Sequence, residues 1–156
     1  SEIDSSELDA LVKVFKARLT NLNEFASDYF EILNELPLLM ATDKDDFIDV
    51  VREDKGKTRI VISRNIKGER DYTIVDKIFD EQITDEIWIY GLDDTDTFTV
   101  SGDAPSSIKV RLIGGHGNDE YVLTSGKNIR VYDHKSLDNT FKSKQGGRII
   151  KTDKKL

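Results

Sequence analysis

The sequence predicts an α+β domain, in which a long N-terminal amphipathic helix precedes a β-hairpin and a short parallel β-solenoid of about three or four coils. Three observations support this class. Apolar residues recur at heptad spacing near the N-terminus, Gly/Asp-rich turns recur at nearly constant separation, and short segments rich in β-branched and aromatic residues flank the turns. At 156 residues the chain can bury a sizeable core, and we expect one domain over residues 1–141.

The first predicted element is a helix over residues 6–36, or a helix pair if Asn21 and Asn23 interrupt it. Pro37 ends it, because the residue before a proline disfavours the α conformation. The apolar stripe consists of Leu8, Val12, Phe15, Leu19, Leu22, Ala26, Tyr29, Leu33 and Leu36. Two interpretations stay open: the stripe packs against the chain's own sheets, or its heptad spacing drives homo-oligomerisation.

The β region is expected over residues 40–141. Two segments rich in strand-forming residues, 58–64 and 71–78, flank a Gly-containing loop at 67–69 and predict a hairpin. We expect this hairpin to be an insertion between the first and second turns of the solenoid. Residues 142–156 are basic and contain a Gly-Gly pair, so we expect a C-terminal linker there.

One turn carries a complete motif. Residues 114–122 read Gly-Gly-His-Gly-Asn-Asp-Glu-Tyr-Val and fit the nonapeptide Gly-Gly-x-Gly-x-Asp-x-U-x, where U is a large apolar residue. This nonapeptide is the repeat of calcium-binding parallel β-rolls. A second copy lies 23 positions earlier and places Asp96 on Asp119 and Phe98 on Tyr121. That separation is typical of one coil of a solenoid.

Two further copies keep less of the motif. Residues 40–48 lack the leading glycine but align Asp45 and Phe47 with the aspartate and aromatic positions. Near the C-terminus, only Asn139 and Phe141 keep those positions, and Asn139 follows Asp119 by 20 residues. The four copies together predict turns that lie above one another in successive coils.

The turns suggest a Ca²⁺ site, because Ca²⁺ takes about six to eight oxygen ligands from carboxylates and backbone carbonyls. The candidate ligands are Asp94, Asp96, Asp119 and the backbone at Gly115 and Gly117. Turn-forming roles are expected for Asp43, Asp45, Gly91, Gly114 and Asn118. The alternative is a metal-free turn, since Asp, Asn and Gly tolerate left-handed conformations and their side chains bond to nearby backbone.

Composition argues against several functions. The formal net charge of −7 disfavours nucleic acid, which requires a basic face. No apolar run is long enough to predict a transmembrane segment, and the absence of cysteine excludes disulfides and thiolate metal sites. Neither His116 nor His134 belongs to a recognisable catalytic motif, so we expect that the chain is not an enzyme.

Five segments carry a resemblance: Thr-Asp-Lys-Asp-Asp-Phe at 42–47, Glu-Ile-Trp-Ile-Tyr-Gly-Leu-Asp at 86–93, Val-Ser-Gly-Asp at 100–103, Ile-Gly-Gly-His-Gly-Asn-Asp at 113–119 and Val-Tyr-Asp at 131–133. With these motifs, most of the chain resembles an internal region of Bacteroidota-type cell-envelope proteins. Those proteins join a calcineurin-like metallophosphoesterase to a surface-antigen-type outer-membrane β-barrel. The resemblance implies an extracytoplasmic, outer-membrane-associated module whose partners are neighbouring domains of one polypeptide. The metal-ligand blocks of the phosphoesterase are missing here.

Three functions follow as expectations. The first is a non-catalytic structural or interaction module of a larger envelope protein, stabilised by Ca²⁺ if the turns bind it. The second is an accessory substrate-binding domain of the phosphoesterase, which requires a concave face lined by residues such as Trp88, Tyr90, Arg111 and Arg130. The third is oligomerisation driven by the heptads of the helix.

Overall fold

The computed structural model describes residues 5–135 and 138–152. The chain falls into two compact units, residues 1–34 and 35–156. The first contains α1 (Ser5–Glu35), one helix of 31 residues, so Asn21 and Asn23 do not divide it into a pair. Every side chain described between residues 9 and 27 is exposed, including those of Phe15 and Phe25. No described helix is long and apolar enough to cross a membrane.

The second unit consists of strands. They are β1 (Leu38–Met40), β2 (Asp46–Glu53), β3 (Lys57–Ile66), β4 (Glu69–Asp80), β5 (Glu86–Asp93), β6 (Thr97–Ser101), β7 (Lys109–His116), β8 (Glu120–Leu123), β9 (Ile129–His134), β10 (Thr140–Lys144) and β11 (Arg148–Thr152). Alternating burial along β2, β5 and β6 follows from the two-residue period of a strand, which turns every second side chain toward the core.

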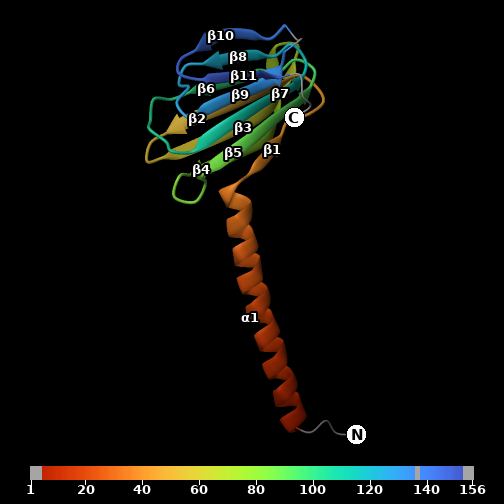
Figure 1. Ribbon diagram of the computed structural model, residues 1–156. Coiled ribbons are helices and arrows are strands. Elements are labelled where there is room, and N and C mark those ends of the chain that lie inside the picture. Colours follow the sequence, from red (N-terminus) through yellow and green to blue (C-terminus); the bar gives the residue numbers. More distant parts are fainter. Residues whose placement is uncertain (1–4, 136–137, 153–156) are drawn as a thin grey trace. The chain divides into compact units, whose positions relative to one another are not determined.

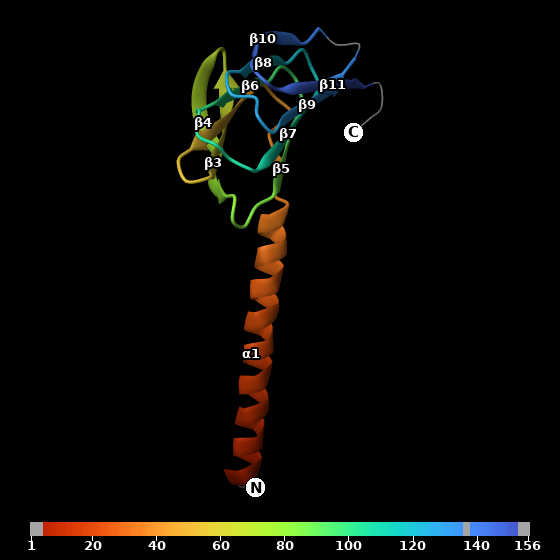
Figure 2. The same cartoon turned by 60° about the vertical axis from the view of Figure 1, so that its left-hand side comes forward.

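These strands form two sheets that lie face to face (Figures 1 and 2). The first sheet has the order β1-β5-β7-β9-β11, and all its pairs are parallel. The second has the order β10-β8-β6-β2-β3-β4. It is parallel from β10 to β2 and antiparallel from β2 to β4. Apart from the β3–β4 hairpin, the chain passes alternately from one sheet to the other.

The core lies between the sheets and is mostly aliphatic, with Phe79 and one stack of rings as its aromatic members. Phe98, Tyr121 and Phe141 occupy the same register position on β6, β8 and β10. Their rings stack with centroids 4.9 Å apart in each pair. Ile48 takes the corresponding position on β2. Burial of each such side chain contributes roughly 1.5–3 kcal/mol, so this column is a main source of stability.

The predicted class, α+β with a parallel β-solenoid, is wrong. The protein is mostly β, with eleven described strands in two sheets and one described helix. The predicted hairpin is present, but it is not an insertion beside a parallel structure. Strand β3 pairs with β2 from Asp46 to Glu53, so the hairpin extends the second sheet and makes it mixed. The cause is that the β2–β3 turn is tight enough for direct antiparallel pairing.

The register confirms two of the predicted alignments and corrects a third. Strand β8 pairs Phe98 with Tyr121 and Tyr121 with Phe141, as the sequence alignment did. In β2, however, Ile48 and not Phe47 lies beside Phe98. The aspartate equivalent to Asp96 is therefore Asp46, one residue later than predicted. Because side chains alternate across a strand, this one-residue slip moves Phe47 to the outer face.

The C-terminal segment also differs from the expectation of a linker from residue 142 onward. Strand β10 extends to Lys144, and β11 pairs with β9 from Arg148 to Thr152. Both strands continue the parallel pairing of their sheets, because the apolar residues Ile149 and Ile150 can add to the first sheet. The described part of this segment is therefore structural.

Candidate functional site

Two of the aspartates predicted to bind metal, Asp96 and Asp119, lie at the start of parallel strands of the second sheet, where they belong to a hydrogen-bonded column. The backbone N–H of Asp46 donates to Oδ1 of Asp96 at 2.9 Å, and the N–H of Asp96 donates to Oδ1 of Asp119 at 2.9 Å. The N–H of Asp119 donates to Oδ1 of Asn139 at 2.8 Å. We call these four residues the Asx ladder. Each rung satisfies a backbone donor that the turn leaves unpaired.

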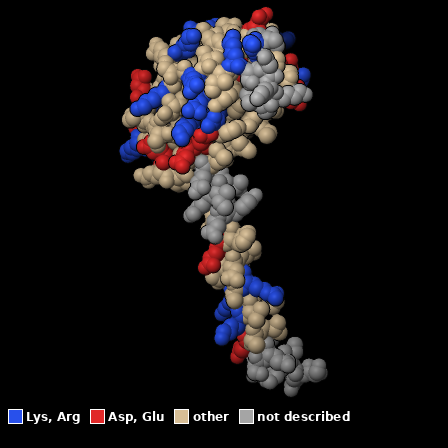
Figure 3. Space-filling model, viewed as in Figure 1, with Lys and Arg blue, Asp and Glu red and all other residues tan. Residues whose placement is uncertain are grey.

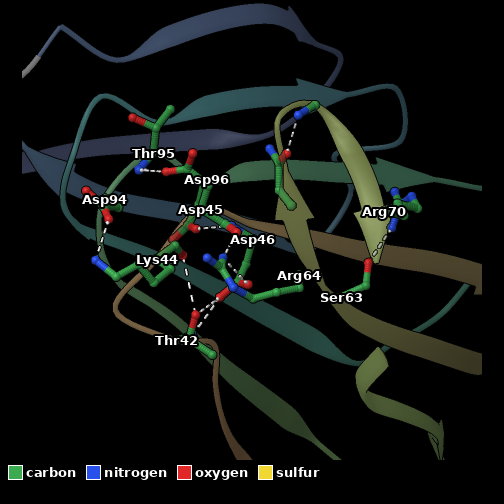
Figure 4. Close-up of polar contacts among 12 residues, drawn as sticks. Thr42, Lys44, Asp45, Asp46, Ser63, Arg64, Arg70, Asp94, Thr95 and Asp96 are labelled. Carbon is green, nitrogen blue, oxygen red and sulfur yellow. Dashed lines mark hydrogen bonds and ion pairs between the residues drawn. The ribbon is translucent and has the colours of Figure 1, made fainter. Parts of the chain in front are cut away.

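A second set of contacts lies at the outside of the same turns (Figure 4). The N–H of Thr95 donates to Oδ1 of Asp45 at 3.0 Å, and Lys44 forms an ion pair with Asp94 at 3.3 Å. Two layers further on, the N–H of Asp138 donates to Oδ1 of Asn118 at 3.1 Å. The Asx side chains at the turns therefore bond the backbone of a neighbouring layer.

The members of the Asx ladder differ in how their second oxygen is satisfied. Oδ2 of Asp46 accepts two hydrogen bonds from Thr42, both of 2.7 Å, and Oδ1 is 3.2 Å from Nη1 of Arg64. Oδ2 of Asp96 and Oδ2 of Asp119 are buried and have no hydrogen-bond partner. A carboxylate in that position is costly, so these two groups are expected to keep a proton.

The electrostatic environment also favours the protonated form of Asp96 and Asp119. Burial raises the pKa of Asp96 to about 9, and the neighbouring acids Asp119 and Asp46 add to the increase. Burial also raises the pKa of Asp119 to about 7, with a further contribution from Asp133. Both side chains are at most 1% exposed. At neutral pH Asp96 is therefore protonated and Asp119 is near the midpoint of its titration.

Two glycines make room for these carboxyl groups. A Cβ on Gly91 would overlap Oδ2 of Asp96, and one on Gly114 would overlap Oδ2 of Asp119. A Cβ on Gly114 would also lie 2.7 Å from Oδ2 of Asp133. The glycines of the motif are thus required by the packing of buried oxygens.

Sequence reasoning missed Asp133, which belongs to this cluster. Asp133 is 1% exposed and accepts a hydrogen bond of 2.6 Å from Oη of Tyr121. Burial raises its pKa, and the bonds from Tyr121 and from the N–H of His134 oppose that increase. The sequence did contain a signal for this burial, because Asp133 continues the alternation of Ile129 and Val131, which point inward from the same strand.

The structure places the predicted Ca²⁺ ligands in both buried and exposed positions, with Gly117 against the backbone carbonyl of Asp94. Asp96 and Asp119 face the core, whereas the side chain of Asp94 is 52% exposed and pairs with Lys44. Gly115 has φ +103° and lies against the carbonyl of Leu92. Among the residues that the structure describes, no group of three or more His, Cys, Asp or Glu side chains has an arrangement that could hold a metal ion. Calcium binding therefore stays a prediction.

A second candidate site is the outer face of the first sheet. The register places Leu38, Trp88, Arg111, Arg130 and Arg148 in one row across five strands. The next outward row holds Met40, Tyr90, Ile113, Tyr132 and Ile150. We define the aromatic–arginine face as Trp88, Tyr90, Arg111, Arg130, Tyr132 and Arg148. Figure 3 shows basic side chains gathered in a band on this side of the sheet.

Arg111 is the fixed centre of the face. Its guanidinium lies 5.1 Å from the ring centroid of Trp88 and 5.6 Å from that of Tyr132. It also forms an ion pair with Glu86 and donates a hydrogen bond to Oη of Tyr132. The hydrogen bond from Arg111 lowers the pKa of Glu86. The Arg111 side chain is 22% exposed and contacts both rings, and the carboxylate of Glu86 compensates its positive charge.

Arg130 and Arg148 have no such partner. Both are exposed, and within residues 5–135 and 138–152 neither forms an ion pair or a ring contact. They lie on neighbouring strands at the same register position, so their charges are adjacent. Like charges directly opposite each other in a sheet are destabilising. Two adjacent, exposed arginines without an acidic partner among the described residues are therefore unexpected in a chain whose net charge is −7.

A hollow lies between the β2–β3 turn and the loops that precede β7 and β9. It has a volume of about 480 Å³ and includes Lys55, Glu81, Ser107 and Lys127 in its lining. The N–H of Ser107 donates to Oε2 of Glu81 at 2.7 Å. The Glu81 carboxylate therefore already occupies the polar part of this hollow. This hollow is better explained as a junction between loops than as a ligand site.

Comparison with known proteins adds no relative: no family model matches the chain, and no curated protein and no solved structure matches it either. The resemblance to envelope proteins with a metallophosphoesterase therefore stays a prediction. The function has to be argued from the two candidate sites themselves.

Proposed function

We propose that this chain is a non-catalytic interaction module that binds an anionic partner through the aromatic–arginine face. The observation that carries this proposal is the pair Arg130 and Arg148, exposed on adjacent strands with no acidic partner among the described residues. A bound anion offsets their mutual repulsion and supplies the carboxylate or phosphate that a guanidinium pairs with best.

The aromatic residues support a binding role in preference to a purely structural one. Trp88, Tyr90 and Tyr132 are partly exposed on the outside of the sheet, away from the core between the sheets. Aromatic and arginine side chains are the types most enriched at recognition sites. The proposal keeps the first function expected from the sequence, an interaction module, and takes its binding residues from the second, whose concave face is replaced here by an open sheet face.

The experiment is a binding titration of the intact chain with a polyanion-bearing matrix, compared with a neutral matrix. The double variant Arg130→Ala, Arg148→Ala should lose most of the retention. The control Lys57→Ala, Lys127→Ala removes the same charge from exposed positions outside the face and should keep it. Equal losses in both variants would show that only net charge matters, and the proposed face would be wrong.

A second candidate, favoured by a separate observation, is self-association through α1. The heptad residues Val12, Phe15, Leu19 and Leu22 are 44–64% exposed, and a heptad stripe is the pattern that a second helix covers in a coiled coil. Sedimentation velocity over a range of protein concentrations tests this candidate. If the chain forms a reversible dimer, the average molecular mass should fall toward that of the monomer on dilution.

A further inference from the structure

The direction of the arginine row indicates how a ligand lies on the face. Trp88, Arg111, Arg130 and Arg148 occupy one register position on β5, β7, β9 and β11. Neighbouring strands are about 4.8 Å apart, so the row spans roughly 14 Å perpendicular to the strands. A ligand that contacts both the rings and the free arginines must therefore be elongated and must cross the strands.

The chemistry of the row indicates which groups the ligand carries. Each guanidinium presents a planar fork of donors that matches a carboxylate. Arg130 and Arg148 offer one such fork per strand, and Arg111 is already paired with Glu86. A polymer with one carboxylate per unit, and a unit length close to the strand spacing, would place successive charges on successive arginines.

The rings indicate what lies between those charges. Trp88 and Tyr132 flank Arg111 and expose part of their surface beside the row. An aromatic ring offers a flat apolar surface to which the C–H face of a pyranose ring is complementary. Alternating apolar faces and carboxylates are the chemistry of a chain of uronic acid residues.

Competing polyanions fit less well. Binding of nucleic acid through its phosphates requires an extended basic surface, whereas this face has two uncompensated arginines and Glu86 at its edge in a chain of net charge −7. An acidic peptide supplies carboxylates but no rigid ring face for Trp88 and Tyr132.

We propose that the aromatic–arginine face binds a linear acidic polysaccharide of the polyuronate type, laid across β5, β7, β9 and β11. This inference rests on the proposed function. It adds the substrate class and the orientation of the ligand, and it makes Trp88 and Tyr132 platforms for sugar rings, with Arg130 and Arg148 as the carboxylate contacts.

The test is isothermal titration of the full chain with oligogalacturonates of increasing length at low salt. Affinity should rise with length until the oligomer spans the row and then level off. Methyl-esterified oligomers of equal length, which lack the charge, should bind at least about tenfold more weakly, as should the unmodified oligomers to Arg130→Ala or to Arg148→Ala. Trp88→Ala should weaken binding without changing its salt dependence, whereas the arginine variants should reduce that dependence.

Two probes separate this inference from the proposed function. If oligothymidylate or polyglutamate binds the face as tightly as oligogalacturonate, or if esterification has no effect, the polysaccharide is wrong and anion binding stands. If no polyanion binds above the level of the double arginine variant, both are overturned. Arg130→Lys keeps the charge but loses the fork, so full affinity in that variant would also contradict a carboxylate held by paired donors.

Discussion

Raising the pH from 5 to 7 should weaken the fold, because the folded protein holds protons on Asp96 and Asp119 that the unfolded chain releases. Burial raises the pKa of Asp96 to about 9 and that of Asp119 to about 7, from an ordinary value of 3.8. Between the unfolded and folded pKa values, each group lowers the free energy of unfolding by about 1.4 kcal/mol per pH unit. Over two units the pair removes about 5 kcal/mol, a large share of the roughly 5–15 kcal/mol that stabilises a domain.

The direction of the effect follows from the raised pKa values. At a pH below the unfolded pKa, both states are protonated and the stability is fully present. As the pH rises toward the folded pKa, ionisation of the unfolded state draws the equilibrium toward unfolding. Above pH 7, of these two groups only Asp96 is still between its unfolded and folded pKa values, so their combined slope should fall to about that of one group. The lowered pKa of Glu86 acts in the opposite sense, but only at a pH below its ordinary value of 4.5.

The assay is urea unfolding followed by circular dichroism at pH 5, 6, 7 and 8 and constant ionic strength. Asp96→Asn resembles the protonated acid and keeps an oxygen that can accept from the N–H of Asp46. It should remove about half of the slope between pH 5 and 7. Asp94→Asn is the matched control, because Asp94 is exposed and the same change there should leave the slope unaltered. A free energy of unfolding that is level or rises between pH 5 and 7 would refute the protonated column.

Three further predictions test other parts of the structure. Gly114→Ala should destabilise the fold by several kcal/mol, roughly the cost of overpacking, because the added Cβ would overlap buried oxygens; chemical denaturation measures this. Arg52→Ala should lower the free energy of unfolding by about 3 kcal/mol, because it would leave buried acceptors unpaired. Arg52 is 4% exposed and donates to Thr58 Oγ1 at 2.7 Å and to the carbonyl of Ile108 at 2.9 Å. Millimolar Ca²⁺ should not raise the melting temperature over EGTA, because the ladder carboxyl groups already accept backbone N–H bonds; a rise of several degrees, lost in Asp119→Ala, would instead support the calcium site predicted from the sequence.

The sequence was informative where a periodicity was strong. The heptad stripe and Pro37 predict a helix over 6–36, and the helix ends at Glu35. The separation of Asp96 and Asp119 predicts the register of β6 on β8, because a repeated turn forces equivalent residues to lie side by side. The class still came out wrong, since nothing in residues 58–78 tells whether a hairpin stands apart from a sheet or joins its edge.

The register of β2 could not be predicted in the same way. The turn at residues 40–45 lacks the glycines that mark its start in the other copies, so Asp45 and Asp46 are equally good matches to the motif. The structure selects Asp46 because its N–H donates to the buried Asp96 and its carboxylate accepts from the half-buried Thr42. That choice depends on long-range contacts, which a local motif does not contain.

The aromatic–arginine face was partly visible in advance, because Trp88, Tyr90, Arg111 and Arg130 were expected to share a surface. Arg148 was missed, since its basic segment was interpreted as a linker. The net charge of −7 for the whole chain was also a poor guide to the surface, because it gives no indication of the row of three arginines on the first sheet. A face is defined by register across strands distant in sequence, and composition averages over it.

The two candidate sites lie on different sheets, the Asx ladder on the second and the aromatic–arginine face on the first. One contact connects them: Tyr121 on β8 donates a hydrogen bond to Asp133, which directly follows Tyr132 on β9. A ligand that binds the aromatic–arginine face of the native state stabilises the fold by mass action, so it should offset part of the stability lost when the unfolded chain releases protons from Asp96 and Asp119. The apparent affinity for the ligand should therefore fall at high pH only as far as the native fraction falls.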